Sequence, residues 1–216
     1  MKDHYLTLAG PSTGEFRDRG SKFLAYAFPV YNEKDWQEAL EGVKKEHSKA
    51  RHHCYAYRLG LDKNNFRAND DGEPSGTAGR PILGQIDSFN LTNVFIVVVR
   101  YFGGTLLGTS GLINAYRESA AEALKNATII EKIIEDTIRV AFDYSIMGDV
   151  MNALKRLNLE MTDQDFGLAP NLNFRVRKSD TDDVLLQFKA LVAQVPLEQA
   201  KVMEKVEGLT IELVEG

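Results

Sequence analysis

Hydrophobic and polar residues alternate along the chain in two successive groups of predicted strands and helices. A period of two residues indicates a strand, and apolar residues three or four positions apart indicate a helix. In the first group we expect strands at residues 14–20, 21–30, 54–59 and 94–99, and helices at 33–47, from about 79 and from about 110. The unbroken apolar run 94–99 is typical of a central strand buried on both faces. Pro81 is expected at the first position of its helix, where proline is well tolerated.

The second group follows a charged, linker-like segment at residues 129–136. Its predicted strands are 137–143, 159–165, 171–177 and 209–214, and its predicted helices are 147–157, 182–194 and 197–206. Strand, helix, strand, strand, helix, strand is the order of a ferredoxin-like domain, although Pro196 divides the second helical segment. We therefore expect an α+β protein with two domains, residues 1–130 and residues 135–216.

Composition places the chain in the class of ordinary globular proteins. It has 216 residues, 44% of them hydrophobic and 26% charged. The opening residues 1–7 lack the features of a signal peptide, and no apolar run approaches the ~20 residues that a spanning helix needs. A single cysteine suits a reducing compartment. We expect a cytoplasmic protein with no membrane partner.

Charge is unevenly distributed along the chain. The net charge is −5, and residues 1–130 carry 16 Lys and Arg against 15 Asp and Glu, whereas residues 131–216 carry 10 against 16. This balance argues against a strongly basic nucleic-acid-binding protein, but it leaves room for a local basic patch. The arginines near the motifs described next are Arg51, Arg58, Arg67, Arg80, Arg100 and Arg117. They could contact phosphate or pair with neighbouring carboxylates.

Two glycine-rich loops are the most unusual segments. Residues 68–81 combine Asp70, Asp71 and Glu73 with three glycines and two prolines, and residues 102–111 follow the apolar run directly. Glycine permits backbone conformations closed to other residues, and proline restricts both itself and the residue before it. We expect the two loops to meet on one face of the first domain.

Histidine, cysteine and carboxylate side chains lie before and within the first loop. These side chains could bind a metal ion, or a cysteine and a histidine could act as nucleophile and base. In a strand, however, His52 and Cys54 point to one face and His53 to the other, so the two histidines cannot share an ion. Cys54 begins an apolar strand, where a cysteine is usually a small buried hydrophobic residue. We therefore expect no metal and no cofactor, and we expect the histidines to donate hydrogen bonds to the backbone of the Asp70–Thr77 loop.

Each glycine-rich loop leads into a predicted helix, whose first amide groups attract anions. An anionic ligand there would meet the charges of Arg80 and Arg100, with Tyr101 and Phe102 as a stacking surface. Neither loop has a nucleotide-binding fingerprint, and the glycines could equally serve tight turns and close packing. The loop residues of this candidate site are Gly76, Thr77, Gly79, Gly103, Gly104, Gly108, Thr109 and Ser110.

These motifs, together with Arg51-His52-His53-Cys54 and Val98 to Gly104, resemble the IMPACT family over roughly residues 15–125. The resemblance implies a first domain like the second domain of a small-subunit ribosomal protein and a ferredoxin-like second domain similar to one in elongation factor G. In eukaryotic relatives the family domain is tied to translational control during amino-acid starvation, a stress response, through a binding partner of the sensor kinase. The bacterial members have no settled activity.

Two functions follow from these observations. The first is a translation-linked regulatory or binding protein that contacts RNA or a ribosome-associated protein through its glycine-rich loops. The second is a hydrolase or phosphotransferase acting on a phosphate-containing substrate, with Asp70, Asp71 or Glu73 as base or metal ligand. Carboxylates that face a concave pocket would favour the enzyme, and carboxylates that point back into their own loop would favour the binding protein.

Overall fold

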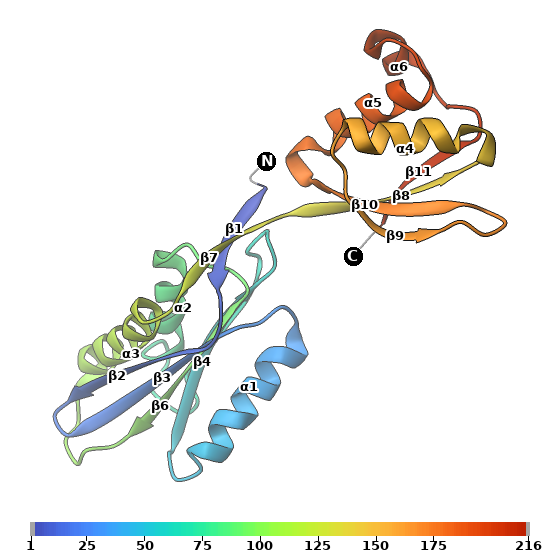
Figure 1. Ribbon diagram of the computed structural model, residues 1–216. Coiled ribbons are helices and arrows are strands. Elements are labelled where there is room, and N and C mark those ends of the chain that lie inside the picture. Colours follow the sequence, from blue (N-terminus) through green and yellow to red (C-terminus); the bar gives the residue numbers. More distant parts are fainter. Residues whose placement is uncertain (1–2, 215–216) are drawn as a thin grey trace. The chain divides into compact units, whose positions relative to one another are not determined.

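The chain forms two compact units, which we describe separately (Figure 1). The first unit is Tyr5–Lys132, and the second comprises residues 133–214 with residues 3 and 4. The computed structural model describes residues 3–214; residues 1, 2, 215 and 216, which the expected domain ranges include, lie outside the described residues. Both units mix helices and strands, so the protein is α+β as predicted. No helix within residues 3–214 has the length and apolar character needed to cross a lipid bilayer.

A five-stranded antiparallel sheet with the strand order β2-β3-β6-β4-β5 is the centre of the first unit. Its strands are β2 Ser12–Asp18, β3 Ser21–Pro29, β4 His52–Leu59, β5 Asn65–Asn69 and β6 Val94–Tyr101. The helices are α1 Glu33–Glu46, α2 Gly79–Ser88 and α3 Gly108–Lys125, and β1 His4–Leu8 pairs separately with β7 Ile129–Ile133. The apolar strand β6 lies in the middle of the sheet, which confirms its prediction as a central strand.

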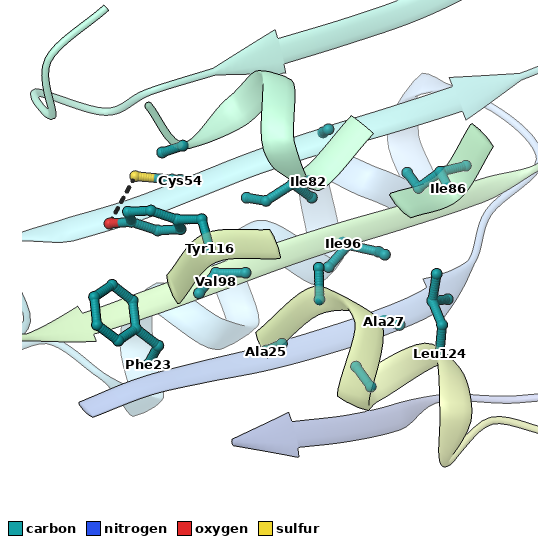
Figure 2. Packing of buried hydrophobic residues seen from close by; sticks show 14 of the residues in the cluster. Phe23, Ala25, Ala27, Cys54, Ile82, Ile86, Ile96, Val98, Tyr116 and Leu124 are labelled. Carbon is teal, nitrogen blue, oxygen red and sulfur yellow. Dashed lines mark hydrogen bonds between the residues drawn. The ribbon is translucent and has the colours of Figure 1, made fainter. Parts of the chain in front are cut away.

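Helices cover both faces of this sheet. Successive side chains of a strand point to opposite faces, so the apolar strand β6 contributes to a core on each side. On one face, Ile96 and Val98 of β6 pack with residues of α2 and α3, among them Ile82 and Tyr116 (Figure 2). On the other face, α1 places Trp36 against side chains that include Tyr55, Tyr57, Phe95, Val97 and Val99. The unbroken apolar sequence of β6 is thus explained by burial on two sides.

The second unit has a four-stranded antiparallel sheet in the order β11-β8-β10-β9. Its elements are β8 Glu135–Phe142, α4 Met147–Arg156, β9 Met161–Asp165, β10 Asn171–Arg177, α5 Thr181–Val192, α6 Leu197–Val202 and β11 Leu209–Val214. Alternate residues of β8 and β10, such as Val140 and Phe174, pack in one apolar cluster with residues of α4 and α5, among them Leu154 and Phe188.

Several boundaries differ from those predicted, and strands β1 and β5 have no predicted counterpart. The segment 129–136, expected to be a linker, belongs mostly to strands, because β7 pairs with β1 and β8 already begins at Glu135. Helix α2 begins at Gly79, so Pro81 is its third residue; its missing N–H still costs nothing within the first turn. Helix α6 is only six residues long, which leaves α5 as the single long helix between β10 and β11.

Candidate functional site at the junction of the two glycine-rich loops

The first glycine-rich loop is folded around the carboxylate of Asp70. Its Oδ2 accepts a hydrogen bond from the backbone N–H of Gly76 at 2.8 Å, and its Oδ1 accepts those of Ala78 at 3.0 Å and Gly79 at 2.8 Å. Ala78 and Gly79 stand at the start of α2, where backbone N–H groups lack partners within the helix. Asp70 therefore caps α2 from outside the helix and closes the loop at the same time.

This capping sets the ionisation of Asp70. Burial by itself would raise the pKa of the carboxyl group, but the amides of Gly76, Gly79 and Ala78 and the nearby charge of Arg80 outweigh it, so its pKa lies below the ordinary value. The carboxylate is thus charged at neutral pH and already occupies the positive end of α2. An external anion, expected at this helix from the sequence, would have to displace Asp70.

The two histidines hold the loop in different ways. The ring of His52 donates from Nδ1 to the backbone carbonyl of Asp71, at 2.8 Å, which confirms the predicted anchoring for this residue. His53 uses its backbone N–H, which donates to the Asp71 carboxylate at 2.6 Å. Its ring Nε2 donates instead to the carbonyl of His47, at 3.2 Å, so a role of the His53 ring in binding the loop backbone is wrong. Adjacent residues of β4 face opposite ways, and this separates the two rings.

A buried ion pair joins the first loop to the end of β6, just before the second loop. Arg100, at the end of β6, donates from Nη1 to Glu73 Oε1 at 2.6 Å, and both side chains are more than 90% buried. The hydroxyl of Tyr116 in α3 donates to the same oxygen at 2.8 Å. Arg100 thus links the two loops, because it pairs with Glu73 of the first and lies 5.7 Å from the ring centroid of Phe102 in the second. A direct contact between the loops stays a prediction. Arg100 is neutralised by Glu73 and is not a free charge partner for an anion.

Cys54 lies beneath this junction and is structural. Its single S–H has two acceptors within reach, the carbonyl of Asp70 at 3.0 Å and the hydroxyl of Tyr116 at 3.3 Å, and Figure 2 shows the second. Burial is the main cause that raises the pKa of the thiol, and the neighbouring carboxylates raise it further. A thiol that stays protonated at neutral pH is a poor nucleophile.

Close backbone contacts explain two of the loop glycines. A Cβ atom on Gly79 would lie 2.4 Å from the backbone nitrogen of Asn69, and one on Gly103 would lie 1.9 Å from the backbone carbon of Gly20. Neither distance is compatible with a side chain, because the blocking atoms belong to the backbone. These glycines let the loops pack against neighbouring strands and turns, which is the packing role considered from the sequence.

A groove of about 680 Å³ opens beside the junction. It is lined by Lys49, Ala50, Arg51, His52, Arg100, Tyr101, Phe102 and Leu106. Phe102 is 57% exposed and Leu106 is 80% exposed, which is unusual for large apolar side chains. Pockets of comparable volume in the second unit are lined by other elements and contain none of the loop residues.

The structure brings only some of the predicted residues to this groove. His52, Arg100, Tyr101 and Phe102 line it, whereas the Thr77 hydroxyl donates to the carbonyl of Pro74 within its own loop. The other predicted residues belong to the first unit but do not line the groove. They are His53, Asp70, Asp71, Glu73, Gly76, Gly79, Arg80, Gly103, Gly104, Gly108, Thr109 and Ser110.

Several residues of the junction have no sequence signal of their own. Tyr116 looks like an ordinary apolar position of α3, and its hydroxyl acquires a role only when Glu73 is placed beside it. Lys49 and Leu106 lie in polar and loop segments, and only the fold places them on one groove. Among residues 3–214, no cluster of three or more His, Cys, Asp and Glu side chains is arranged to hold a metal ion.

Comparison with known proteins identifies the family to which this chain belongs. The family model described as the Impact N-terminal domain matches residues 19–124. IMPACT family member YvyE of Bacillus subtilis is 37% identical over 155 residues, which cover 72% of this chain and 71% of that protein. IMPACT family member YigZ of Escherichia coli is 37% identical over 132 residues, covering 60% of this chain and 65% of YigZ. The chain therefore belongs to the IMPACT family.

A solved structure supports the fold over the whole length. It is described as the crystal structure of a hypothetical protein, and it matches with a TM-score of 0.70 and 27% sequence identity. The match covers 100% of this chain and 99% of the other. The fold of each unit therefore has a counterpart in an experimentally determined structure.

Proposed function

We propose that the protein is a cytoplasmic, translation-linked regulatory protein that binds RNA or a ribosome-associated protein through the groove beside its glycine-rich loops. Membership of the IMPACT family supports the link to translation, because the resemblance ties its relatives to translational control. The observation that carries the binding role is the direction of the loop carboxylates. Asp70, Asp71 and Glu73 all bond to groups of the protein itself, while Lys49, Arg51, Phe102 and Leu106 of the groove are exposed.

A hydrolase or phosphotransferase is less well supported. Such an enzyme needs a carboxylate that is free to act as base or to hold a metal ion. Asp70 is used by three backbone amides, Asp71 by the amide of His53, and Glu73 by Arg100 and Tyr116. Releasing any of them would open the loop junction.

We further propose that the two units are separate domains with the folds implied by the family. Each unit has its own apolar clusters, which is the usual property of a domain. In the second unit the strand order β11-β8-β10-β9 corresponds to 4-1-3-2 in a β-α-β-β-α-β unit, and this order supports a ferredoxin-like fold. The five-stranded sheet of the first unit is the candidate counterpart of the ribosomal-protein domain.

Under this proposal the predicted binding residues have different roles. His52, Arg100, Tyr101 and Phe102 line the contact surface directly. Others fix the shape of the loops through backbone hydrogen bonds or close approach, as Asp70 and Gly103 do. The start of α3 at Gly108, Thr109 and Ser110 has no acidic residue in its first turn and remains a candidate for anion contact beside the groove.

The experiment that tests the proposed function is co-sedimentation of the full chain with ribosomal particles in a sucrose gradient of cell lysate. The double variant Lys49→Ala/Arg51→Ala should remain in the unbound fractions at the top of the gradient. The variant Lys34→Ala/Lys125→Ala, which removes the same charge away from the groove, should sediment as the parent does. A parent protein that never co-sediments, or a groove variant that still does, would contradict the proposal.

A further inference from the structure

The groove carries unbalanced positive charge. Lys49 and Arg51 are exposed, and neither forms an ion pair with any residue of the described chain. Arg100 is already paired with Glu73, and none of the lining residues is acidic. The charge of the groove is therefore complementary to an anionic partner, even though the first half of the chain is close to neutral.

An exposed aromatic ring lies beside these cations. The guanidinium of Arg100 lies over two rings, with its Cζ 5.5 Å from the centroid of Phe23 and 5.7 Å from that of Phe102. Phe23 is fully buried, so this stack fixes the position of Phe102 while leaving more than half of it exposed. Aromatic rings next to cationic side chains are the usual platform for unpaired bases.

His52 adds a hydrogen-bond acceptor to the same groove. Its Nδ1 faces the carbonyl of Asp71, and a carbonyl oxygen can only accept, so Nδ1 carries the proton. In the neutral ring Nε2 is then an acceptor, and it has no hydrogen-bond partner within residues 3–214. An acceptor among cations does not suit a phosphate, but it does suit a hydroxyl group, such as the ribose 2′-OH that distinguishes RNA from DNA.

We infer that the groove binds single-stranded RNA, with phosphates on Lys49 and Arg51, a base on Phe102, and a ribose 2′-OH donating to His52 Nε2. This inference rests on the proposed function and specifies its partner. A folded duplex does not fit as well, because its bases are not available for stacking on a side chain. The contact is small, so affinity should be modest, and its two phosphate contacts should make log affinity fall with log salt at a slope of about 1.4.

Fluorescence anisotropy with a labelled eight-nucleotide uridine RNA and the matching deoxyuridine DNA tests this inference on the full chain. We expect the parent to bind the RNA about five- to tenfold more tightly than the DNA. Lys49→Ala/Arg51→Ala should weaken both and reduce the slope of log affinity against log salt by about 1.4, at about 0.7 for each lost phosphate contact. Phe102→Leu should weaken both by about tenfold. Lys34→Ala/Lys125→Ala should change neither.

Two variants of His52 separate its contact with RNA from its role in the loop. Asn places an amide N–H near the position of Nδ1 and removes Nε2, so His52→Asn should keep the loop anchored and bring RNA affinity down to that of DNA. His52→Gln places its amide near Nε2 and should preserve the preference for RNA better. Hydrogen exchange of residues 70–79 monitors the loop in both variants.

Failure of the RNA inference can be distinguished from failure of the proposed function. A parent that binds no RNA at 50 mM salt, or that binds RNA and DNA equally, would overturn the inference. So would RNA binding that the groove variants do not change. If the parent co-sediments with ribosomes through the groove but binds no RNA oligonucleotide, the groove meets a protein, and only the inference on RNA fails. If neither occurs, both proposals fail.

Discussion

At the scale of single residues, the loop junction depends on charged groups that are satisfied by the protein itself. Asp70 replaces the anion that the start of α2 would otherwise attract, and Glu73 neutralises Arg100. Buried or half-buried charges of this kind are costly to leave without partners. The glycine-rich loop is therefore a fixed structure that shapes the groove, and its carboxylates are not available for chemistry.

Asp70→Asn should show this role directly. Three backbone amides donate to the charged carboxylate of Asp70. Removing this charge should lower the free energy of unfolding at pH 7 by about 2 kcal/mol. Because the folded pKa of Asp70 lies below the ordinary value of 3.8, its contribution is complete above that value and is lost as pH falls through the lowered folded pKa. The difference between parent and variant should therefore shrink below about pH 3.8.

Urea unfolding followed by the fluorescence of Trp36 measures this difference, since it is the single tryptophan and lies in the first unit. Asp18→Asn is the control, because the Asp18 carboxylate makes no hydrogen bond or ion pair within the described chain. A difference between Asp70→Asn and the parent that persists unchanged to pH 3 would contradict the role assigned to Asp70.

At the scale of elements, α1 shows how sequence signals act locally. Asn32 precedes the helix, and its side-chain oxygen accepts the N–H of Asp35 at 3.0 Å. The Asp35 carboxylate accepts the N–H of Tyr31 in return, at 2.7 Å. The first bond satisfies a free donor of the first turn, and the second ties the residue before the cap to the helix. The cap fixes where α1 begins and so helps to place Trp36 on the sheet.

Asn32→Ala should cost about 1 kcal/mol of unfolding free energy, because one amide of the first turn loses its partner. Glu41→Ala, at an exposed position of the same helix, should stay within about 0.5 kcal/mol of the parent. Both values come from urea unfolding followed by fluorescence. Equal stability of Asn32→Ala and the parent would mean that packing alone fixes the start of α1.

The elements predicted best are those with a strong local pattern. The apolar run of β6 and the cap of α1 could be predicted from the sequence because burial on two faces and capping each leave a local signature. The boundary segment 129–136 is predicted to be a linker because its apolar and charged residues come in pairs and lack the two-residue period of a strand. Its strand β7 forms through pairing with the distant strand β1. The groove could be predicted only in part, because it is the pairing of β4 with β6 that brings Lys49 beside Phe102 and Leu106.

At the scale of the whole molecule, the candidate site and the excess negative charge lie in different parts of the chain. The groove and both glycine-rich loops belong to the first unit, whereas residues 131–216 carry most of the negative charge. A negatively charged unit is repelled by nucleic acid. If the groove binds RNA as we infer, the contact should therefore involve the first unit and not the second.

Independence of the two units is testable in the intact chain. Phe188 is fully buried in the cluster of the second unit, with its ring centroid 5.5 Å from that of Phe174. Phe188→Ala should therefore destabilise that unit by about 3–5 kcal/mol. If the units are separate domains, hydrogen exchange should accelerate in β8, β10 and α5, while the amides of β6 keep the protection they have in the parent.

The reciprocal variant completes the test. Ile96→Val in β6 removes one buried methylene from the first unit and should cost about 1 kcal/mol there, leaving exchange in β8 and β10 unchanged. Hydrogen exchange resolved by mass spectrometry assigns each loss of protection to its unit. Acceleration in β6 of the Phe188→Ala protein to the same extent as in β8 would mean that the chain unfolds as one cooperative body, and the two units would then be parts of a single domain.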